Sequence, residues 1–552
     1  MKIRLFLLVI YSLISLQGQS QWNIDPSINT QVSVGSHNQS NCYIVTDGKK
    51  GAIMVWEDHR NDSTYSDIYS QRLNAEGYPI WTANGIPICT DTLSQKNEVI
   101  IDAGNGSAII AWQDDRNGNA DIYAQKVDSS GNLLWALNGV GVCTTSNNQR
   151  KPALTSDMNG GAIIAWEDSS STSNVDIYAN RIDANGILKW GSGGVSICSA
   201  INKQSNIKVR QDTKGGAIIG WQDFRNGLEY YVYAQRVDST GALLWIANGV
   251  KVCPTGGGQT NPKLREDGQG GVYVGWQDKR SGGYDAYAQR LSASGTLLWN
   301  SLGVAVCNYL GNQSALDMST EGINGAIISW KDNRTGIVQV YANKISPSGV
   351  LQWGTYGMLI ATGINPNTVG DESGGVIITW QDSVNSGGTW NVYAQRIDSL
   401  GTKLWLNTGA PVATANGGQS SPKQVSTGDG GAIFCWQDKR STTDLDVYAH
   451  HLFPSGLSYI ETIEEYKKDK IIIACSPNPF QSDATISINS LDKIKTWTIN
   501  VFDNTGQLVF TEIMNNTSSS KIDGNVLANG IYLYQAINNS EIIGSGKFVI
   551  TK

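Results

Sequence analysis

The residues that could perform chemistry in this sequence are concentrated in short stretches such as AWQDDRNGNADIYAQ, from Ala111 to Gln125. This stretch holds an aromatic, two adjacent carboxylates, an arginine, a third carboxylate and a tyrosine. Two carboxylates that face each other about 5–10 Å apart can hydrolyse glycosides, and arginine binds carboxylates or sulfates bidentately. A catalytic cluster, a ligand-binding ring and a polar turn of the scaffold are therefore the three interpretations.

The number of copies favours the turn. A Trp followed two residues later by Asp occurs eight times, at intervals of 50 to 56 residues. Six copies add an Arg two residues after the Asp: Asp58/Arg60, Asp114/Arg116, Asp223/Arg225, Asp278/Arg280, Asp332/Arg334 and Asp438/Arg440. An active site needs one asymmetric cluster rather than six similar ones. We therefore interpret the Asp as a turn cap and the Arg as a tie between repeats.

Variation between the copies indicates where a ligand would bind, because scaffold positions must agree and binding positions need not. Two copies lack the Arg and read Ser169-Ser170 after Asp168 and Ser383-Val384 after Asp382. The loops after the Trp-x-Asp motif also carry extra aromatics that suit stacking on sugar rings or on a protein surface. These candidate ligand-binding residues are Tyr65, Tyr230, Tyr231, Tyr284 and Trp390.

No catalytic residue, metal site or cofactor is predicted. Asp114 to Asp121 alternates oxygen-bearing residues somewhat like a calcium loop, but the other copies do not keep them. The four histidines, His37, His59, His450 and His451, lack the spacing of zinc ligands. His450-His451 stands where most other units have Gln-Arg. The Asp-box of sialidases is absent.

The eight cysteines are predicted to be structural thiols rather than disulfides. Five of them recur eight residues after a second Trp of the repeat, at Cys89, Cys143, Cys198, Cys253 and Cys307. Ala361 and Ala413 take this place in later units, and Cys435 replaces the Ala111 of the second repeat. Equivalent positions in neighbouring repeats should lie beyond the roughly 7 Å Cα limit for a disulfide.

Each repeat contains four short β-rich runs bounded by Gly, Asn and Asp, which is typical of a propeller blade. A linear β-solenoid is the structural alternative. Seven units carry the second Trp and the eighth does not, whereas a matching segment begins at Trp22. We expect Trp22 to Val34 to be the outer strand of the last blade. The sequence thus predicts an all-β fold in which residues 21–457 form an eight-bladed propeller closed by its N-terminal strand.

The chain ends and the charge suggest an exported protein. Residues 1–20 have a charged start, a short apolar core and small residues before Gln21, which predicts a signal peptide. No other segment is long and apolar enough to span a membrane. The net charge is −7 and there is no basic tract, so nucleic acid is not an expected partner.

The last part of the chain differs from the repeats. Residues 458–474 form a charged linker, and residues 475–552 predict a small β-sandwich. SPNPF (Ser476 to Phe480), NVFDNTGQLV (Asn500 to Val509), LANGIYLY and the terminal GKFVITK resemble the type A C-terminal sorting domain of the type IX secretion system. The resemblance implies passage through the outer membrane of a Bacteroidota-type bacterium, with the type IX machinery as the partner of residues 475–552. It also implies removal of this domain, leaving the mature protein attached to surface lipopolysaccharide or released.

The repeat region is similar to propeller repeats that accompany such tails, and that similarity names no ligand. We expect a secreted cell-surface binding or adhesion module without catalytic activity, whose ligand is a glycan or a protein. A carbohydrate-active enzyme, either a glycoside hydrolase or a lyase, is the first alternative. A structural surface-layer component is the second.

Overall fold

The structure is a computed structural model that describes residues 22–552 except 170–173, 256, 321, 385–386, 442, 459–472, 489–495 and 539–540. The predicted signal peptide and nearly all of the predicted linker lie outside the described residues. The chain divides into two compact units, residues 1–460 and residues 461–552. Within the described part, no helix has the length and apolar character needed to cross a membrane.

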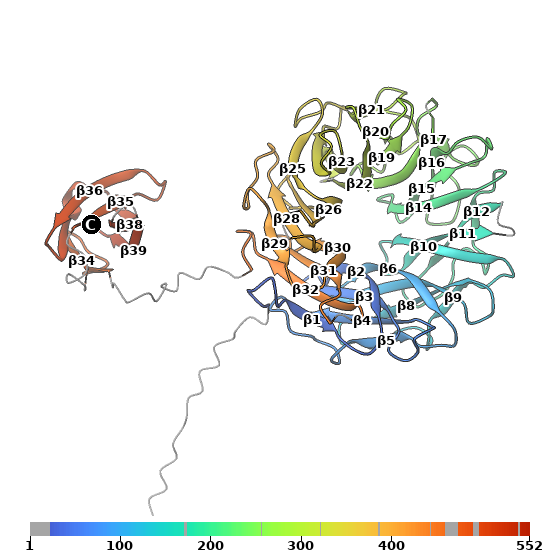
Figure 1. The fold of residues 1–552 in the computed structure, drawn as a ribbon, viewed down its shortest axis with the longest axis horizontal. Coiled ribbons are helices and arrows are strands. Elements are labelled where there is room, and N and C mark those ends of the chain that lie inside the picture. Colours follow the sequence, from blue (N-terminus) through green and yellow to red (C-terminus); the bar gives the residue numbers. More distant parts are fainter. Residues whose placement is uncertain are drawn as a thin grey trace, which may run out of the picture. The chain divides into compact units, whose positions relative to one another are not determined.

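The described residues of the first unit form eight four-stranded antiparallel sheets (Figure 1). The first four are β2 (Gln39–Thr46), β3 (Ala52–Asp58), β4 (Asp67–Leu73) and β5 (Ile86–Cys89); β6 (Gln95–Gly104), β7 (Ser107–Asp114), β8 (Asp121–Val127) and β9 (Val140–Cys143); β10 (Asn148–Ser156), β11 (Ala162–Ser169), β12 (Val175–Ile182) and β13 (Val195–Cys198); and β14 (Gln204–Gln211), β15 (Ala217–Asp223), β16 (Tyr231–Val237) and β17 (Val250–Lys251).

The other four sheets continue the same order. They are β18 (Thr260–Glu266), β19 (Val272–Asp278), β20 (Asp285–Leu291) and β21 (Val304–Cys307); β22 (Gln313–Thr320), β23 (Ala326–Asp332), β24 (Gln339–Ile345) and β25 (Met358–Thr362); β26 (Ile364–Gly370), β27 (Val376–Asp382), β28 (Asn391–Ile397) and β29 (Ala410–Ala413); and β30 (Gln419–Ser426), β31 (Ala432–Asp438), β32 (Asp446–Leu452) and β1 (Thr30–Ser33). A single 3₁₀ turn, η1 (Gly322–Asn324), precedes β23.

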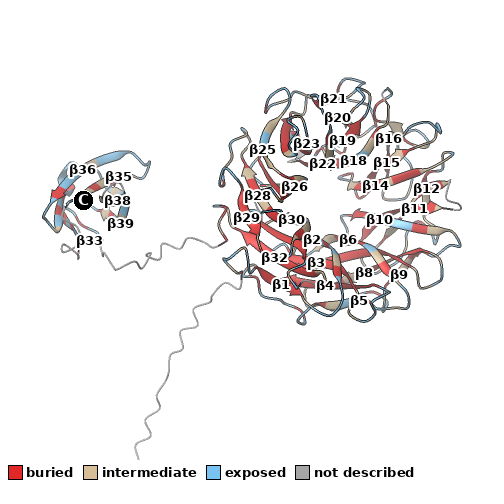
Figure 2. Cartoon of the chain, in the orientation of Figure 1, coloured by how far each residue is buried: buried red, intermediate tan, exposed pale blue. Residues whose placement is uncertain are grey.

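The second strand of each sheet is buried on both faces. β3 and β19, for example, are buried along their whole length, and Figure 2 shows such strands in red. A strand covered on both faces needs continuous β-branched and small residues, which runs such as AIIAW supply. In six of the eight sheets the Trp that ends the run stacks on a Tyr of the third strand, as in the Trp112–Tyr123 pair at 6.4 Å between ring centroids. The two aromatics thus cover each other in these sheets.

The second Trp of each repeat joins one sheet to the next. Trp81 lies against Gly131 in the following repeat, and its indole Nε1 donates a hydrogen bond to the carbonyl of Ser129 at 3.2 Å. Gly131 has a φ of +91°, and a Cβ there would come within 2.9 Å of the indole, so only glycine fits. The equivalent indole donations are Trp135 to Ala184, Trp190 to Ser239, Trp245 to Ala293, Trp299 to Pro347, Trp353 to Ser399 and Trp405 to Pro454.

Trp22 makes the same contact for the last sheet. Its indole donates to the carbonyl of Ala75 at 2.8 Å, and its ring lies against Gly77 of the first repeat. The strand that follows is shorter than the predicted Trp22 to Val34, because only Thr30–Ser33 pairs with β32. The segment around Trp22 packs on a neighbouring turn instead of joining the sheet ladder.

The first strand of each sheet carries a β-bulge marked by a residue with positive φ. These residues are Asn41, Asn97, Lys151, Asn206, Asn261, Ala315, Asn365 and Ser421. The register shifts at each of them, which turns the residues that follow. In Figure 1 these first strands lie nearest the centre of the unit. An all-β, propeller-like fold is confirmed.

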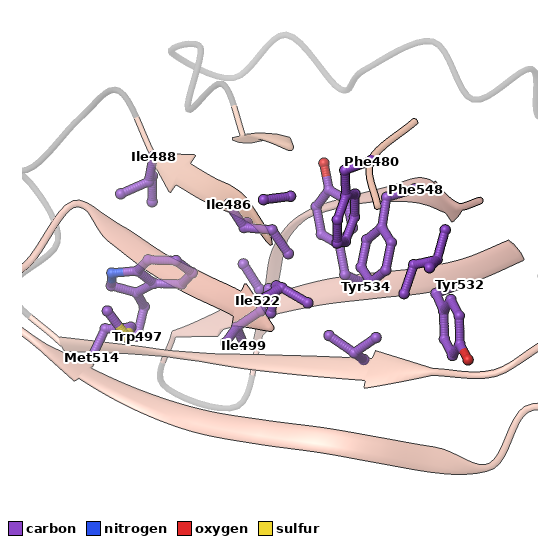
Figure 3. Packing of buried hydrophobic residues seen from close by; sticks show 14 residues of the cluster. Phe480, Ile486, Ile488, Trp497, Ile499, Met514, Ile522, Tyr532, Tyr534 and Phe548 are labelled. Carbon is purple, nitrogen blue, oxygen red and sulfur yellow. The ribbon is translucent and has the colours of Figure 1, made fainter. Parts of the chain in front are cut away.

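The described residues of the second unit form two sheets around one core. The smaller contains β33 (Ile473–Ser476), β34 (Asp483–Ile488) and β37 (Ser519–Asp523), and the larger contains β36 (Leu508–Asn515), β35 (Thr496–Phe502), β38 (Gly530–Asn538) and β39 (Glu541–Ile550). A 3₁₀ turn, η2 (Gly524–Val526), follows β37. Figure 3 shows Ile486 and Ile522 of the smaller sheet facing Trp497 and Ile499 of the larger one, as in a β-sandwich.

Candidate functional site

The recurring Asp and Arg form one compact unit in each of the six copies that contain both. In the copy with Asp332, the carboxylate accepts hydrogen bonds from Trp330 Nε1 at 2.8 Å, from the Arg334 backbone N–H at 2.9 Å and from the Arg334 guanidinium at 2.6 Å. The guanidinium also lies 4.0 Å above the Tyr341 ring. The Asp side chain is fully buried in all six copies: Asp58, Asp114, Asp223, Asp278, Asp332 and Asp438.

The arginine side chains contact residues outside their own turn, which fits the predicted role of linking repeats. Arg116 donates to the carbonyl of Asn138 at 2.9 Å and lies 3.1 Å from the Sγ atom of Cys89 in the preceding sheet. Arg225, Arg280 and Arg334 make the same sulfur contact with Cys198, Cys253 and Cys307. Arg60 and Arg440 instead reach Ser33 and Asn29 of the N-terminal segment. These carboxylates and guanidinium groups neutralise each other away from solvent, which favours a structural role.

The two copies without this Arg satisfy their Asp differently. Asp168 accepts from the side-chain amides of Asn147 and Gln149, and Asp382 accepts from the Thr362 hydroxyl and the Val384 backbone N–H. Residues 170–173 and 385–386, which would complete these loops, lie outside the described residues.

The five aromatic residues predicted to bind a ligand belong to four different sheets; four lie in loops, and Tyr231 is the first residue of β16. Tyr65 and Trp390 are exposed, at 42% and 39%. Tyr230 packs on Phe224, Tyr231 lies under the Lys251 ammonium group and Tyr284 lies under Lys279. Three of the five therefore have partners within the protein, and the fold distributes the set around the ring rather than in one pocket.

A different set of residues meets at the centre of the first unit. Lys208 and Arg210 of β14, Lys263 and Arg265 of β18, and Lys423 of β30 follow the bulges of their strands at two equivalent positions. Lys423 is electrostatically coupled to Lys263, although their sheets are not neighbours in the repeat order. These residues lie on first strands, which are nearest the centre of the unit in Figure 1, and the charge of Lys263 acts on Lys423.

Few carboxylates balance these cations. Asp317 of β22 pairs with Lys263 at 3.2 Å, and Glu266 lies 4.0 Å from Arg210. Burial opposes ionisation of Asp317, but Lys263 and Arg265, together with the Thr368 backbone N–H, lower its pKa to about 2. Desolvation, followed by repulsion from Lys263 and Arg210, lowers the pKa of Lys208 to about 7. Glu167 also acts on Lys208, so three carboxylates, Asp317, Glu266 and Glu167, offset the five cations among the described residues.

The repeat shows that the fold does not require these cations. The positions equivalent to Arg210 hold Val45, Ile101, Val369 and Val425 in other sheets, and those equivalent to Lys208 include Val99 and Ala153. A cavity of about 500 Å³ lies beside the ends of β18, β22 and β26, and Arg265, Glu266 and Glu372 are among the residues that line it. Aligning the first strands on their bulges would have revealed the cluster in the sequence, but the bulge positions are not evident without the structure.

Two buried histidines make stability depend on pH. Burial, and then the charge of the neighbouring ring, lowers the pKa of His450 to about 3, and burial lowers that of His451 to about 4. His450 faces the Ser458 hydroxyl at 2.8 Å, and the charge of Asp25 acts on it. His451 packs between the rings of Trp22 and Phe453. The charges of Asp429 and Lys50 act on His451.

Both histidines are neutral in the folded and unfolded states above pH 6.5. As the pH falls below 6.5, the unfolded chain binds protons that the folded protein does not, so stability is lost progressively toward the folded pKa values. We expect His450 alone to remove about 2 kcal/mol of unfolding free energy between pH 7 and pH 5. Urea titrations at both pH values check this. His450→Gln, which installs the residue of other repeats, should reduce the pH dependence. Equal pH dependence of unfolding free energy for His450→Gln and the parent protein would contradict the expectation.

Among the described residues, no group of three or more His, Cys, Asp or Glu side chains is arranged to hold a metal ion.

The fold defines an all-β protein with propeller-like repeats. Residues 475–551 match the family of secretion system C-terminal sorting domains. The C-terminal unit is thus a sorting domain of the type IX system, and the protein is exported across the outer membrane to the cell surface or the extracellular space.

No curated protein matches the sequence at a significant level. Among solved structures, the chain is similar to a protein of unknown function from Dyadobacter fermentans DSM 18053 (11% identity, 55% of this chain, 94% of the other, TM-score 0.34). It is also similar to a mutant α-L-arabinofuranosidase of Fusarium graminearum (12%, 56%, 94%, TM-score 0.32). A third similar structure is an ulvan lyase bound to a saccharide of glucuronic acid and sulfated rhamnose (10%, 69%, 96%, TM-score 0.40). At these scores the similarities carry no functional argument.

Proposed function

We propose that residues 21–457 form a closed eight-bladed propeller that acts as a cell-surface binding module, preceded by a signal peptide at residues 1–20. A linker at residues 458–474 joins it to the sorting domain at residues 475–552, which engages the type IX machinery. The pairing of β1 with β32 and the packing of Trp22 on the first repeat support closure by the N-terminal strand.

The proposed ligand is an acidic glycan, bearing carboxylate or sulfate groups, that binds at the cluster of cations on the first strands. The observation that carries this proposal is the cluster of Lys208, Arg210, Lys263, Arg265 and Lys423. Other repeats place apolar residues at these positions, so the cations are not needed for folding, and they are incompletely paired within the protein. An anionic ligand would supply the missing charge through charge-assisted hydrogen bonds. The exposed Tyr65 and Trp390 remain candidates for stacking on additional sugar rings.

The first test removes the charge without altering the scaffold. Lys208→Val with Arg210→Val installs a residue that other repeats use at these positions. We expect this variant to fold and to lose about tenfold or more in affinity for acidic polysaccharides, or about 1.4 kcal/mol. The control, Lys49→Gln with Lys439→Gln, removes two cationic side chains from exposed positions and should bind like the parent protein.

Binding is measured by calorimetry at two salt concentrations against uronic acid-containing, sulfated and neutral polysaccharides, with product analysis of each mixture. Equal affinity for neutral and acidic polymers, or equal affinity of both variants, would contradict the proposed ligand. Release of shortened products would instead favour a glycoside hydrolase or lyase. Absence of binding and turnover would favour a surface-layer component.

A further inference from the structure

Two cysteines lie against each other where the first and last sheets of the repeat region meet. Cys42 is on β2 of the first sheet, and Cys435 is on β31 of the last, 393 residues away in the chain. Their Sγ atoms are 2.8 Å apart, and both side chains are at least 98% buried. They belong to one apolar cluster that also contains Trp22 and Val32 of the N-terminal segment.

The other buried cysteines of the repeats have different neighbours. Cys89, Cys198, Cys253 and Cys307 contact arginine side chains, and Cys143 lies near the Thr145 hydroxyl. None of these five has another cysteine as a hydrogen-bonding or close-contact partner in the described residues. The Cys42–Cys435 contact is therefore distinct from the small buried slot that the recurring cysteines fill.

The repeat also shows that neither position calls for cysteine. The residue after the bulge, where Cys42 stands, is Glu98, Pro152, Ile207, Pro262, Leu316, Pro366 or Pro422 in the other sheets. The residue before the Trp, where Cys435 stands, is Val55, Ala111, Ala165, Gly220, Gly275, Ser329 or Thr379. Cysteine thus occurs at each position once, and both occurrences meet at the junction between the two ends of the repeat region.

We infer that Cys42 and Cys435 form a disulfide in the exported protein and so link its first and last sheets covalently. Two thiols become one disulfide with loss of two protons and two electrons. The oxidant is a protein disulfide of the thiol–disulfide exchange class, which is reduced to two thiols as the new S–S bond forms. Exported proteins encounter such oxidants outside the cytoplasm.

The surroundings indicate when this reaction occurs. Burial raises the pKa of the Cys42 thiol, with Cys435 as the next largest cause, so the reactive thiolate is disfavoured once the sheets have packed. Exchange therefore takes place while the junction is still open, and the finished bond is shielded from reductants by the apolar cluster around it. The disulfide holds the junction through a bond that does not depend on the packing of the N-terminal segment.

The test uses the full chain, exported through an oxidising compartment and purified without reductant. Labelling with an alkylating reagent in denaturant should modify six of the eight cysteines, and all eight after reduction. Proteolysis and mass spectrometry should recover Cys42 and Cys435 in one reducible peptide pair. Modification of all eight cysteines before reduction would overturn the inference, as would a disulfide that joins other cysteines.

Variants separate the bond from the effect of losing a side chain. Without reductant, the variant with both Cys42→Ala and Cys435→Ala should have a melting temperature several degrees below that of the parent protein. After denaturation and refolding in reductant, the parent should melt close to the double variant. Cys89→Ala, at a position where later repeats have Ala361 and Ala413, serves as the control and should respond to reductant as the parent does. An identical response of the double variant and the parent to reductant would argue against the bond.

Discussion

Deleting residues 21–36 is expected to lower the melting temperature more than any single substitution in the repeats. The deletion removes β1, exposes the edge of β32 and uncovers the apolar cluster between the last and first sheets. It also removes the Ile28 carbonyl and the Asn29 side chain, which accept hydrogen bonds from Arg440. Calorimetry of the truncated and complete proteins measures the loss.

A single residue of the segment gives a matched pair of variants. Trp22 is 1% exposed and Ile24 is 61% exposed, so the two apolar side chains differ chiefly in burial. Trp22→Ala should cost about 3–5 kcal/mol, as truncation of a buried Trp does. Ile24→Ala should cost less than about 0.5 kcal/mol. An unchanged melting temperature after the deletion, or equal effects of the two substitutions, would defeat the model of closure by the N-terminal strand.

The repeat made the fold predictable from the sequence. Eight copies of Trp-x-Asp, with Gly-bounded β-rich runs around each, defined the strands and their order because every copy supplies the same pattern. The length of the outer strands was harder to predict from the sequence. The repeat identified Trp22 as the missing second Trp, but nothing in the pattern shows that its side chain packs on the neighbouring turn while strand pairing begins only at Thr30.

The central cluster was not predictable because it depends on the bulges. A residue in the left-handed region shifts the register, and in three sheets that residue is Lys151, Ala315 or Ser421 rather than Asn. Without knowledge of this shift, the sequence gives no sign that Lys208 and Lys263 lie near each other, because they belong to different strands. Cys42 and Cys435 posed a similar difficulty, since their proximity depends on how the first and last sheets meet rather than on the spacing between neighbouring repeats.

The second large effect is expected at Asp332, one of the six buried turn residues. Asp332→Ala removes the acceptor of the Trp330 indole and the carboxylate partner of Arg334, whose side chain is only 10% exposed. A buried charge that loses its partner typically costs about 3–5 kcal/mol. The unfolding free energy of this variant, from urea titration, should fall by about that amount.

A double-mutant cycle shows how much of this loss comes from the stranded arginine. Arg334→Ser installs a serine like that of the copy containing Asp168, and adding it to Asp332→Ala should restore about 1–3 kcal/mol, because the unpaired guanidinium is then gone. Asp382→Ala is the matched control, since its copy has no such Arg, and it should cost less than Asp332→Ala. If the double variant is no more stable than Asp332→Ala, the arginine is not stranded by loss of the carboxylate. The Asp would then act mainly as a turn cap, and the tie between sheets would rest on the contacts of Arg334 with the Tyr356 carbonyl and Cys307.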